Sequence, residues 1–591
     1  MTNNGILQIV FYLLIIIALT RPLGWYIAQI YENKPCGINR LLQPFEKLIY
    51  KLCGIQAEQE MEWKQYLYSL LMLSLVGFLF VYGIQRLQYY LPFNPQQFPG
   101  VSPNISFNTA ASFITNTDWQ AYSGERTLSY FTQMIALTVQ NFLSAAIGMS
   151  LLMAFIRGLA RAETKSLGNF WVDTVRGIIY ILLPLAFLLA IALSAQGVIQ
   201  NFKPYQKVTL LQPIQYPAPE LNSSKTIITE QELPMGPVAS MVAIKQLGTN
   251  GGGFFNTNSA HPFENPTPLS NFLEMLAILL IPAALCSTFG IMVKDKRQGW
   301  TLFFAMLILF IPMIAGALYY EQQGNPALTA LGIDQTVKPD LFPGGNMEGK
   351  ETRFGIVNSS LWAIATTATA NGSVNSMHDS YMPLSGMAMV WLMHLGEIVF
   401  GGIGTGVTGM LMMVIITVFV AGLMVGRSPE YLGKKIEPYE MKMVSIAVLI
   451  MPLAVLLLTA IASVTLMGTS SLTNPRSHGF SEMLYAFTSM GNNNGSAFAG
   501  LNAATPFYTM AGGFEMMLLR FWIAISVMAI AGSLASKKLI PASAGTLPTH
   551  NVLFIILLIA VAGILGALTF FPTLALGPIA EYLRLGVTYG H

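Results

Sequence analysis

Charged residues are scarce in this chain. Only 10% of its 591 residues are Asp, Glu, Lys or Arg, whereas hydrophobic residues make up 53%. A soluble globular domain carries about 25% charged residues, so this composition excludes an ordinary soluble protein. The net charge of +3 is too small to indicate a nucleic-acid partner.

The chain also lacks a long polar segment that could fold as a soluble domain. Its three cysteines, Cys36, Cys53 and Cys286, do not have the spacing of a disulfide framework or a metal site. The N-terminal stretch has neither a positively charged start nor a small-residue cleavage site. We therefore interpret it as a first membrane span and not as a signal peptide.

Long apolar stretches are present instead. A helix needs about 20 apolar residues to cross a bilayer, and ten segments approach or exceed this length. They are residues 6–30, 66–90, 131–156, 172–196, 271–293, 300–320, 386–424, 443–467, 508–535 and 551–571. The sequence therefore predicts an all-α polytopic membrane protein with ten transmembrane helices.

The connections between these spans differ in charge. The loops 31–65, 157–171, 294–299, 425–442 and 536–550 hold 17 Lys plus Arg in 89 residues, whereas the other side of the membrane holds 10 in 244 residues. Short basic loops face the cytoplasm. We therefore expect both termini and all the long loops to lie outside.

Four of the long outer loops carry a related three-residue motif. The motifs are Thr115-Asn116-Thr117, Thr249-Asn250-Gly251, Ala370-Asn371-Gly372 and Asn493-Asn494-Gly495. They follow spans two, four, six and eight. The predicted units are an N-terminal extra helix with a cytoplasmic loop (1–65), four pore repeats (66–156, 172–293, 300–424 and 443–535) and a C-terminal extra helix (551–591).

Each motif follows a short run of small and apolar residues, such as 357–369 and 480–490. A helix of about 11 residues is only about 16 Å long, so it enters the bilayer without crossing it. Its C-terminal end carries a partial negative charge. Because Asn and Gly tolerate left-handed backbone angles, the carbonyl groups that follow can turn inward and replace the hydration shell of potassium.

The sequence thus predicts four pseudo-symmetric helix–pore loop–helix units around a central selectivity filter. An ordinary Asn-Gly turn would explain any single copy, but four copies at equivalent positions favour a pore. The motifs contain no carboxylate, except that Asp118 follows the first copy. This favours a large monovalent cation over calcium.

The seventh predicted span is too long for one straight helix and contains four closely spaced glycines, which are Gly401, Gly402, Gly404 and Gly406. Glycine weakens a helix by about 1 kcal/mol per residue relative to alanine. We expect a break there, and irregular backbone at membrane depth survives where it is buried or lines a water-filled path.

Two charged residues inside the predicted spans are candidates for a role in the ion path. Arg520 is either one partner of a structural ion pair or a fixed positive charge below the filter, which would bar straight passage of cations. Glu397 precedes the glycine-rich break. It either serves a passing cation, ties down the broken helix or pairs with buried groups, and His394 could share its helix face.

Two segments resemble nucleotide-binding motifs without meeting their requirements. The segment 344–351 nearly matches a P-loop, but Glu351 replaces the Ser or Thr that would bind magnesium. The segment 404–409 fits GxGxxG but has no preceding strand. The chain also lacks the DKTGT motif of P-type ATPases, so we expect no nucleotide binding and no enzymatic activity of its own.

Several longer motifs resemble a known family. They are TNTDWQAYSGE (115–125), GTNGGGFFNTNSAHPFENPTP (248–268), NGSVNSMHDS (371–380), GGIGTG (401–406) and NNNGSAFAG (492–500). Over essentially its full length the chain resembles the KdpA family, the potassium-binding subunits of bacterial Kdp ATPases within the superfamily of potassium transporters.

The resemblance implies a channel-like subunit in the bacterial inner membrane, surrounded by membrane lipids, with potassium as its bound substrate. It implies three partners: the catalytic P-type ATPase subunit KdpB, the single-span subunit KdpC and the one-helix peptide KdpF. It also implies that the twelve motif residues form the potassium filter, with Thr117 in place of glycine in the first copy.

Two alternatives differ from an ATP-driven pump subunit. A stand-alone potassium channel or a Trk/Ktr-type symporter subunit would share the same fold. A secondary transporter with inverted repeats is disfavoured, because all four motif loops are predicted on one side of the membrane.

Overall fold

The computed structural model describes residues 3–34, 37, 39–216, 226–337, 344–541 and 546–589. Cys36 lies outside these residues. Ten helical segments of the described chain are long and apolar enough to cross a membrane, which confirms the predicted number. They are Asn3–Tyr31, Trp63–Tyr90, Thr132–Ala160, Phe170–Ala195, Pro268–Met292, Lys296–Ala330, Thr405–Val425, Pro438–Val464, Pro506–Ser536 and Val552–Thr588.

The main helices of these segments are α1 (Asn3–Tyr31), α3 (Trp63–Leu87), α6 (Val139–Ala160), α7 (Phe170–Arg176), α8 (Leu183–Ala195), α10 (Pro268–Met292), α11 (Lys296–Gln323), α15 (Thr405–Val425), α16 (Pro438–Val464), α19 (Pro506–Ser536), α20 (Val552–Leu574) and α21 (Ala580–Tyr589). Shorter helices are α2 (Asn39–Cys53), α5 (Gly124–Thr127), α12 (Pro326–Ala330), α14 (Pro383–His394) and α17 (Leu466–Thr469). Four further short helices, α4, α9, α13 and α18, precede the motifs and are described with the site.

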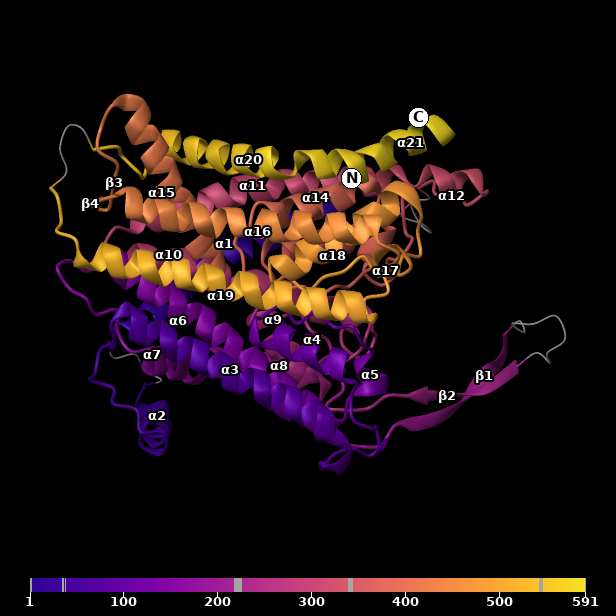
Figure 1. Cartoon of the computed structure of the whole chain (residues 1–591). Coiled ribbons are helices and arrows are strands. Elements are labelled where there is room, and N and C mark those ends of the chain that lie inside the picture. The colour runs from indigo at the N-terminus through magenta and orange to yellow at the C-terminus, as the bar shows by residue number, and fades with distance from the viewer. Residues whose placement is uncertain are drawn as a thin grey trace.

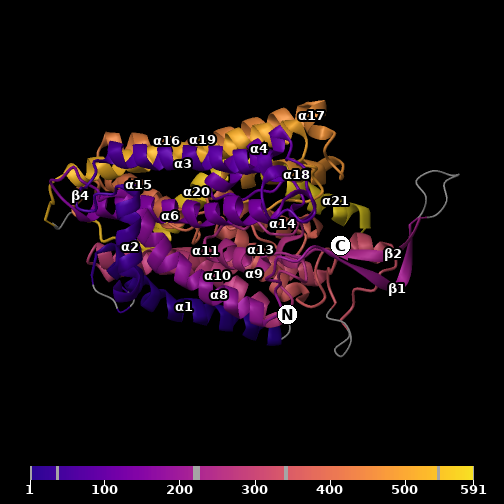
Figure 2. The ribbon, with the colours of Figure 1, turned by 90° about the horizontal axis from the view of Figure 1, so that it is seen from below.

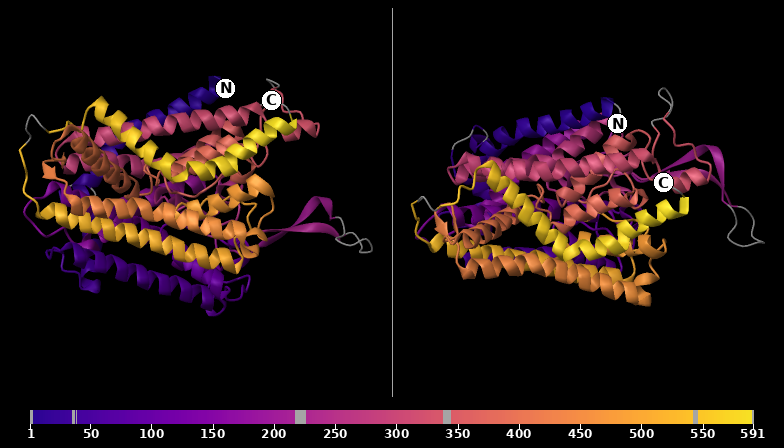
Figure 3. Two further views of the ribbon diagram at one scale, coloured as in Figure 1. Left: turned by 45° about the horizontal axis from the view of Figure 1, so that its top comes forward. Right: turned by 90° about the horizontal axis from the view of Figure 1, so that it is seen from above.

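Two small antiparallel sheets complete the described structure. Strands β1 (Gln206–Tyr216) and β2 (Thr226–Leu233) form a hairpin, and β3 (Glu430–Tyr431) pairs with β4 (Lys434–Lys435). The hairpin projects from one end of the helix bundle, whereas α2 and the β3–β4 pair lie at the other end (Figure 1). Both termini lie toward the hairpin end (Figures 2 and 3), as an even number of spans requires.

Capping side chains mark the start of several of the spans. Helix α10 starts at Pro268, where the preceding Thr267 accepts a hydrogen bond from the Ser270 N–H. Asn551 caps α20 by accepting from the Phe554 N–H. Such side chains satisfy backbone N–H groups that have no partner within the first helical turn.

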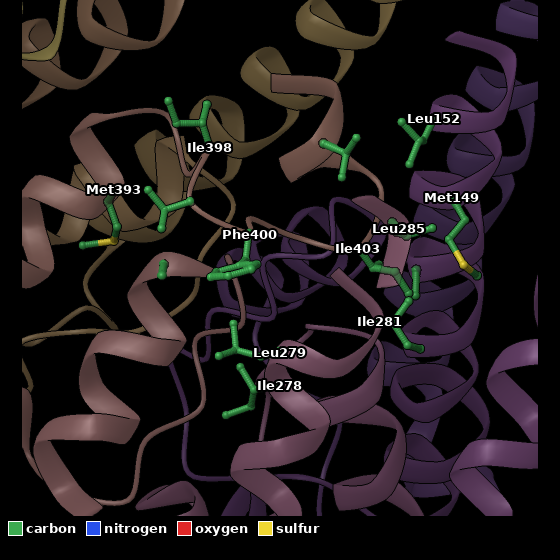
Figure 4. Close-up of a cluster of buried hydrophobic side chains, with 14 of the residues drawn as sticks. Met149, Leu152, Ile278, Leu279, Ile281, Leu285, Met393, Ile398, Phe400 and Ile403 are labelled. Atoms are coloured by element: carbon green, nitrogen blue, oxygen red, sulfur yellow. The ribbon is translucent and has the colours of Figure 1, made fainter. Parts of the chain in front are cut away.

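One part of the apolar core lies between α6, α10 and a non-helical segment that joins α14 to α15. Figure 4 shows Met149 and Leu152 of α6, Ile281 and Leu285 of α10, and Ile403 of the joining segment as neighbours in one apolar cluster. The outward sides of the spans are apolar too, as exposed Leu and Ile side chains on α1, α3 and α20 show. This is the surface expected of helices that face lipid.

The expected break in the seventh predicted span is present, but it is longer than predicted. Helix α14 ends at His394 and α15 begins at Thr405, so only α15 forms a span. Glu397 therefore lies inside the break, at a φ of 50°, and not before it. Gly406 lies in the first turn of α15, so it is outside the break.

Candidate functional site

Four short helices stand before the four motifs. They are α4 (Pro103–Ile114), α9 (Val238–Leu247), α13 (Gly355–Ala368) and α18 (Arg476–Gly491), with 12, 10, 14 and 16 residues. At about 1.5 Å per residue, even α18 is shorter than the bilayer core of about 30 Å. Their C-terminal halves are buried, so all four end inside the protein.

The chain leaves each short helix by the same turn. In every copy, one backbone N–H bonds to the carbonyl group five residues earlier. The four bonds run from Thr117 to Ser112, Asn250 to Lys245, Asn371 to Thr366 and Asn494 to Ser489, at 3.0, 2.9, 3.2 and 2.9 Å. The shared geometry supports treating the four loops as copies of one motif.

This turn corrects the alignment of the first copy. Left-handed backbone angles occur at the residue before and the residue after the shared N–H donor. The first set is Asn116, Thr249, Ala370 and Asn493, and the second set is Asp118, Gly251, Gly372 and Gly495. The first motif is therefore Asn116-Thr117-Asp118, one residue later than predicted, because the end of α4 sets the register and not the position of its asparagine.

The four motifs touch one another in a closed ring. A Cβ atom on Gly251 would overlap the carbonyl oxygen of Asn371, one on Gly372 that of Asn494, and one on Gly495 that of Thr117. The first and second motifs meet where a Cβ on Gly252 would lie 2.9 Å from the Cβ of Asp118. Each glycine therefore allows close approach of the next motif's backbone.

The asparagine side chains join neighbouring copies. The Asn371 amide donates to the Lys245 carbonyl (3.2 Å) and the Asn494 amide donates to the Thr366 carbonyl (3.0 Å). The Asn250 amide donates to the Oδ1 atom of Asn116 (2.7 Å). The side chains thus hold the ring together.

A buried ion pair supports the second motif, and sequence analysis missed it. Lys245 and Glu264 are both fully buried and form a salt bridge. Lys245 also donates to Asn258 Oδ1 (2.7 Å), and the Asn258 amide donates to the Gly251 carbonyl (2.6 Å). The feature of the sequence that could have revealed this ion pair is a lysine within the apolar run that precedes the second motif.

The break between α14 and α15 contacts the motifs directly. The Gly401 N–H donates to the carbonyl of Ala368, the last residue of α13 (3.1 Å), and the Ile403 N–H donates to Thr249 Oγ1 (2.9 Å). A Cβ on Gly402 would lie 3.2 Å from the Cβ of Ala370. The break thus lies against the second and third motifs.

Glu397 contacts the fourth motif. Its Oε1 atom accepts a hydrogen bond from the Asn494 amide (2.7 Å). His394 does not share a helix face with it, because α14 ends at His394, whose Nε2 atom lies 3.0 Å from Thr488 Oγ1. Of the roles expected for Glu397, tying down the broken segment has a direct contact in its favour.

Arg520 lies on the same cavity as Glu397. This cavity of about 130 Å³ is lined by Asn116, Ala370 and Asn493 of the motifs as well as by Gly402. In the part of the chain that the structure describes, no carboxylate lies within 4.0 Å of the Arg520 guanidinium group. Arg520 thus forms no direct ion pair there, although Glu397 lines the same cavity.

A second charged residue of α19 was missed. Glu515 is 2% exposed, and among the described residues neither of its carboxylate oxygens has a hydrogen-bond partner. A Cβ on Gly491 would lie 3.0 Å from its Oε1 atom, so the carboxylate lies against the C-terminal end of α18. The signal was an acidic residue inside a predicted span.

The lysine of the P-loop-like segment is already engaged. Lys350 is 7% exposed, and its Nζ atom pairs with Glu321 at 2.7 Å and lies 4.1 Å from the centre of the Tyr381 ring. In a P-loop the lysine reaches the phosphates, whereas Lys350 is held by Glu321.

The family described as "Potassium-transporting ATPase A subunit" matches residues 10–583. The chain belongs to this family. The potassium-transporting ATPase potassium-binding subunits of Methylococcus capsulatus and Herpetosiphon aurantiacus are 57% and 58% identical to it, each over 99% of this chain and 99% and 100% of their own lengths.

Among solved structures, the crystal structure of the potassium transporter TrkH from Vibrio parahaemolyticus aligns with 85% of this chain and 96% of its own, with a TM-score of 0.48 and 13% identity. The family match and the ten apolar helices establish a multi-pass membrane protein of the potassium-transporting ATPase A subunit family. The family match extends across all four motifs and the break.

Proposed function

We propose that this chain binds and selects potassium as the channel-like, non-catalytic subunit of an ATP-driven potassium uptake complex. The closed ring of four motifs, in which each glycine faces the backbone carbonyl of the next copy, is the observation that carries the proposal. The relatives' names as potassium-binding subunits support it.

The filter is formed by backbone oxygens of the four motifs. They belong to residues 115–118, 249–251, 370–372 and 493–495. Neutral carbonyl rings bind a large dehydrated monovalent cation. Four short helices point their C-terminal ends, with their partial negative charge, toward the same place. Asp118 adds a carboxyl group in one quadrant only.

Below the filter, the break and Arg520 bar straight passage. The fixed positive charge of Arg520 repels a cation that enters the cavity, and the cavity continues between α15, α16 and α20, where Met413, Met451 and Gly566 line it. We infer that the ion turns sideways there toward a partner subunit.

The partners are the catalytic P-type ATPase subunit KdpB together with KdpC and KdpF. The description of the family as the A subunit of a transporting ATPase supports the existence of partner subunits. The complex lies in the bacterial inner membrane, with both termini outside and the β1–β2 hairpin on the same side. The basic loops support this orientation. The chain binds no nucleotide, and its four pore repeats are residues 66–156, 172–293, 300–424 and 443–535.

Reconstitution separates this function from the stand-alone channel. Liposomes holding the purified chain alone should show no sustained potassium flux, whereas the complete complex should take up potassium when ATP is supplied on the cytoplasmic side. Potassium flux through the chain alone, at rates comparable to the complex and without ATP, would establish the channel alternative instead.

A further inference from the structure

A cluster of titratable side chains lies apart from the filter. His478 and Glu482 are four residues apart on α18 and therefore share a helix face. Asp379 lies in the 3₁₀ turn His378–Ser380, and Glu581 lies in α21. The His478 Nε2 atom is 3.1 Å from Asp379 Oδ1, and its Nδ1 atom is 2.8 Å from Glu581 Oε1.

Three of these residues converge on one point. Asp379, His478 and Glu482 each offer a ligand atom, and the three atoms all lie within 4.8 Å of one another. Zinc is bound in proteins by imidazole nitrogen and carboxylate oxygen at about 2.0–2.2 Å. Atoms that are all bound to one ion at this distance must lie less than about 4.4 Å apart, so small side-chain movements would suffice.

Glu482 provides an independent sign of an absent ligand. It is fully buried, and the Asn474 amide donates to its Oε1 atom at 2.7 Å. Its Oε2 atom is buried and has no hydrogen-bond partner within the described ranges. A buried carboxylate oxygen without a partner is unfavourable, and a bound cation would satisfy it.

The histidine is oriented as metal-bound histidines are. A ligating imidazole usually presents one nitrogen to the metal and donates the other N–H to a carboxylate. Here Nδ1 faces Glu581 and Nε2 faces Asp379. Glu581 would thus fix the ring, while Asp379, His478 and Glu482 would be the three protein ligands and water would complete the coordination.

The backbone leaves room for this cluster at Gly500. A Cβ there would overlap Glu482 Oε1 and would lie 2.6 Å from Asp379 Oδ2.

We propose that Asp379, His478 and Glu482 form a binding site for a divalent transition-metal cation of the zinc type, with Glu581 as the residue that positions His478. The site joins the loop after the third motif to the short helix of the fourth. It does not depend on the potassium selectivity proposed above, because it uses none of the filter residues.

The test uses the purified untagged full chain in its complex, stripped with EDTA, passed into metal-free buffer and titrated with zinc chloride. We expect one zinc ion per chain by elemental analysis after gel filtration. Asp379→Asn, His478→Gln and Glu482→Gln should each lower zinc affinity by at least tenfold. Glu581→Gln should lower it by about 10–100-fold. The exposed His550, changed to Gln, is the matched control and should bind zinc as the wild type does.

Cobalt(II) provides a second measurement that needs no variant. Cobalt(II) bound by one nitrogen and oxygen ligands at low coordination number absorbs visible light much more strongly than aqueous cobalt, and zinc should abolish this added absorption. The proposal is overturned if the wild type binds less than about 0.1 zinc ion per chain when zinc is added at about the concentration of the protein. It is also overturned if the ligand variants and His550→Gln bind zinc equally. A cobalt absorption in the wild type no stronger than that of aqueous cobalt would overturn it too.

Discussion

At the scale of single residues, one position of the motif shows how backbone conformation restricts residue choice. Gly251, Gly372 and Gly495 have φ values of 86°, 84° and 101°, and each lies against a carbonyl of the next motif. A side chain there is disfavoured both by the backbone angle and by lack of space. Asp118 holds the fourth place at a φ of 51°, which Asp tolerates better than most residues.

Gly372→Ala should weaken potassium binding by about tenfold. The added methyl group would overlap the Asn494 carbonyl oxygen, and a non-glycine residue in such a conformation costs about 1–3 kcal/mol, where 1.4 kcal/mol is a factor of ten. The measurement is the potassium concentration for half-maximal ATPase activity of the assembled complex. Gly316→Ala in α11 is the control, since a Cβ there meets nothing within 4 Å; equal affinities for both variants would contradict the proposed filter.

Asp118 tests the corrected alignment of the first copy. Asp118→Gly should assemble into the complex, because glycine accepts the φ of 51° at that position. Asp118→Val should assemble poorly, because β-branched residues resist left-handed angles. The yield of intact complex after gel filtration compares the two. Similar yields would argue that Asp118 does not hold the glycine position.

The sequence predicted the four motif loops better than the contacts that support them. Eleven of the twelve predicted motif residues lie in the shared turns, because four copies repeat the same chemistry. Asp118 was not assigned to the glycine position, because an alignment on asparagine does not show where α4 ends. Lys245 and Glu264 are 19 residues apart, so only the folded loop shows that their charges neutralise each other.

At the scale of elements, the break between α14 and α15 is held against the motif loops by hydrogen bonds. Its backbone donates to the end of α13 and to Thr249, and Glu397 accepts from Asn494. One irregular segment thus contacts three of the four motifs. Glycine density predicted the break, and α14 ends just before Gly396, which has a φ of 78°.

Substitutions of Glu397 distinguish a support from a charge that serves the ion. Glu397→Gln keeps an oxygen that can accept from Asn494, so the potassium affinity of the complex should change by less than about threefold. Glu397→Ala removes the acceptor and should lower the affinity by about tenfold, since a hydrogen bond to a charged group contributes about 1.5–3 kcal/mol. If Gln and Ala are equally harmful, the negative charge and not the hydrogen bond is what the filter needs.

Arg520→Gln should impair coupling more than selectivity. Arg520 lines the cavity and not the ring, so the preference for potassium over sodium should stay within about twofold of the wild type, whereas potassium transported per ATP should fall by more than about half. Both are measured in liposomes with the complete complex. Arg126→Gln, at an exposed arginine of α5, is the control. Lost selectivity with normal coupling would place Arg520 in the filter itself.

At the scale of the whole molecule, this chain consists of membrane helices with few polar extensions. The purified chain, freed of all partners, should hydrolyse ATP at no more than the background rate, because its P-loop-like lysine is buried against Glu321 and it has no phosphorylation motif. Phosphate release is measured with and without potassium. Hydrolysis that persists after removal of every partner subunit would contradict the non-catalytic role.

The closed ring is built from one polypeptide, so each of its four motifs is encoded by its own codons and can mutate separately. In a pore of four identical subunits, one codon change alters four positions at once. Here Asp118, Lys245 and Glu397 each occur in a single quadrant, so natural selection can adjust one side of the ring while three stay constant. The same property lets an experimenter substitute one, two or three glycines and measure how ion preference changes with the number of substitutions.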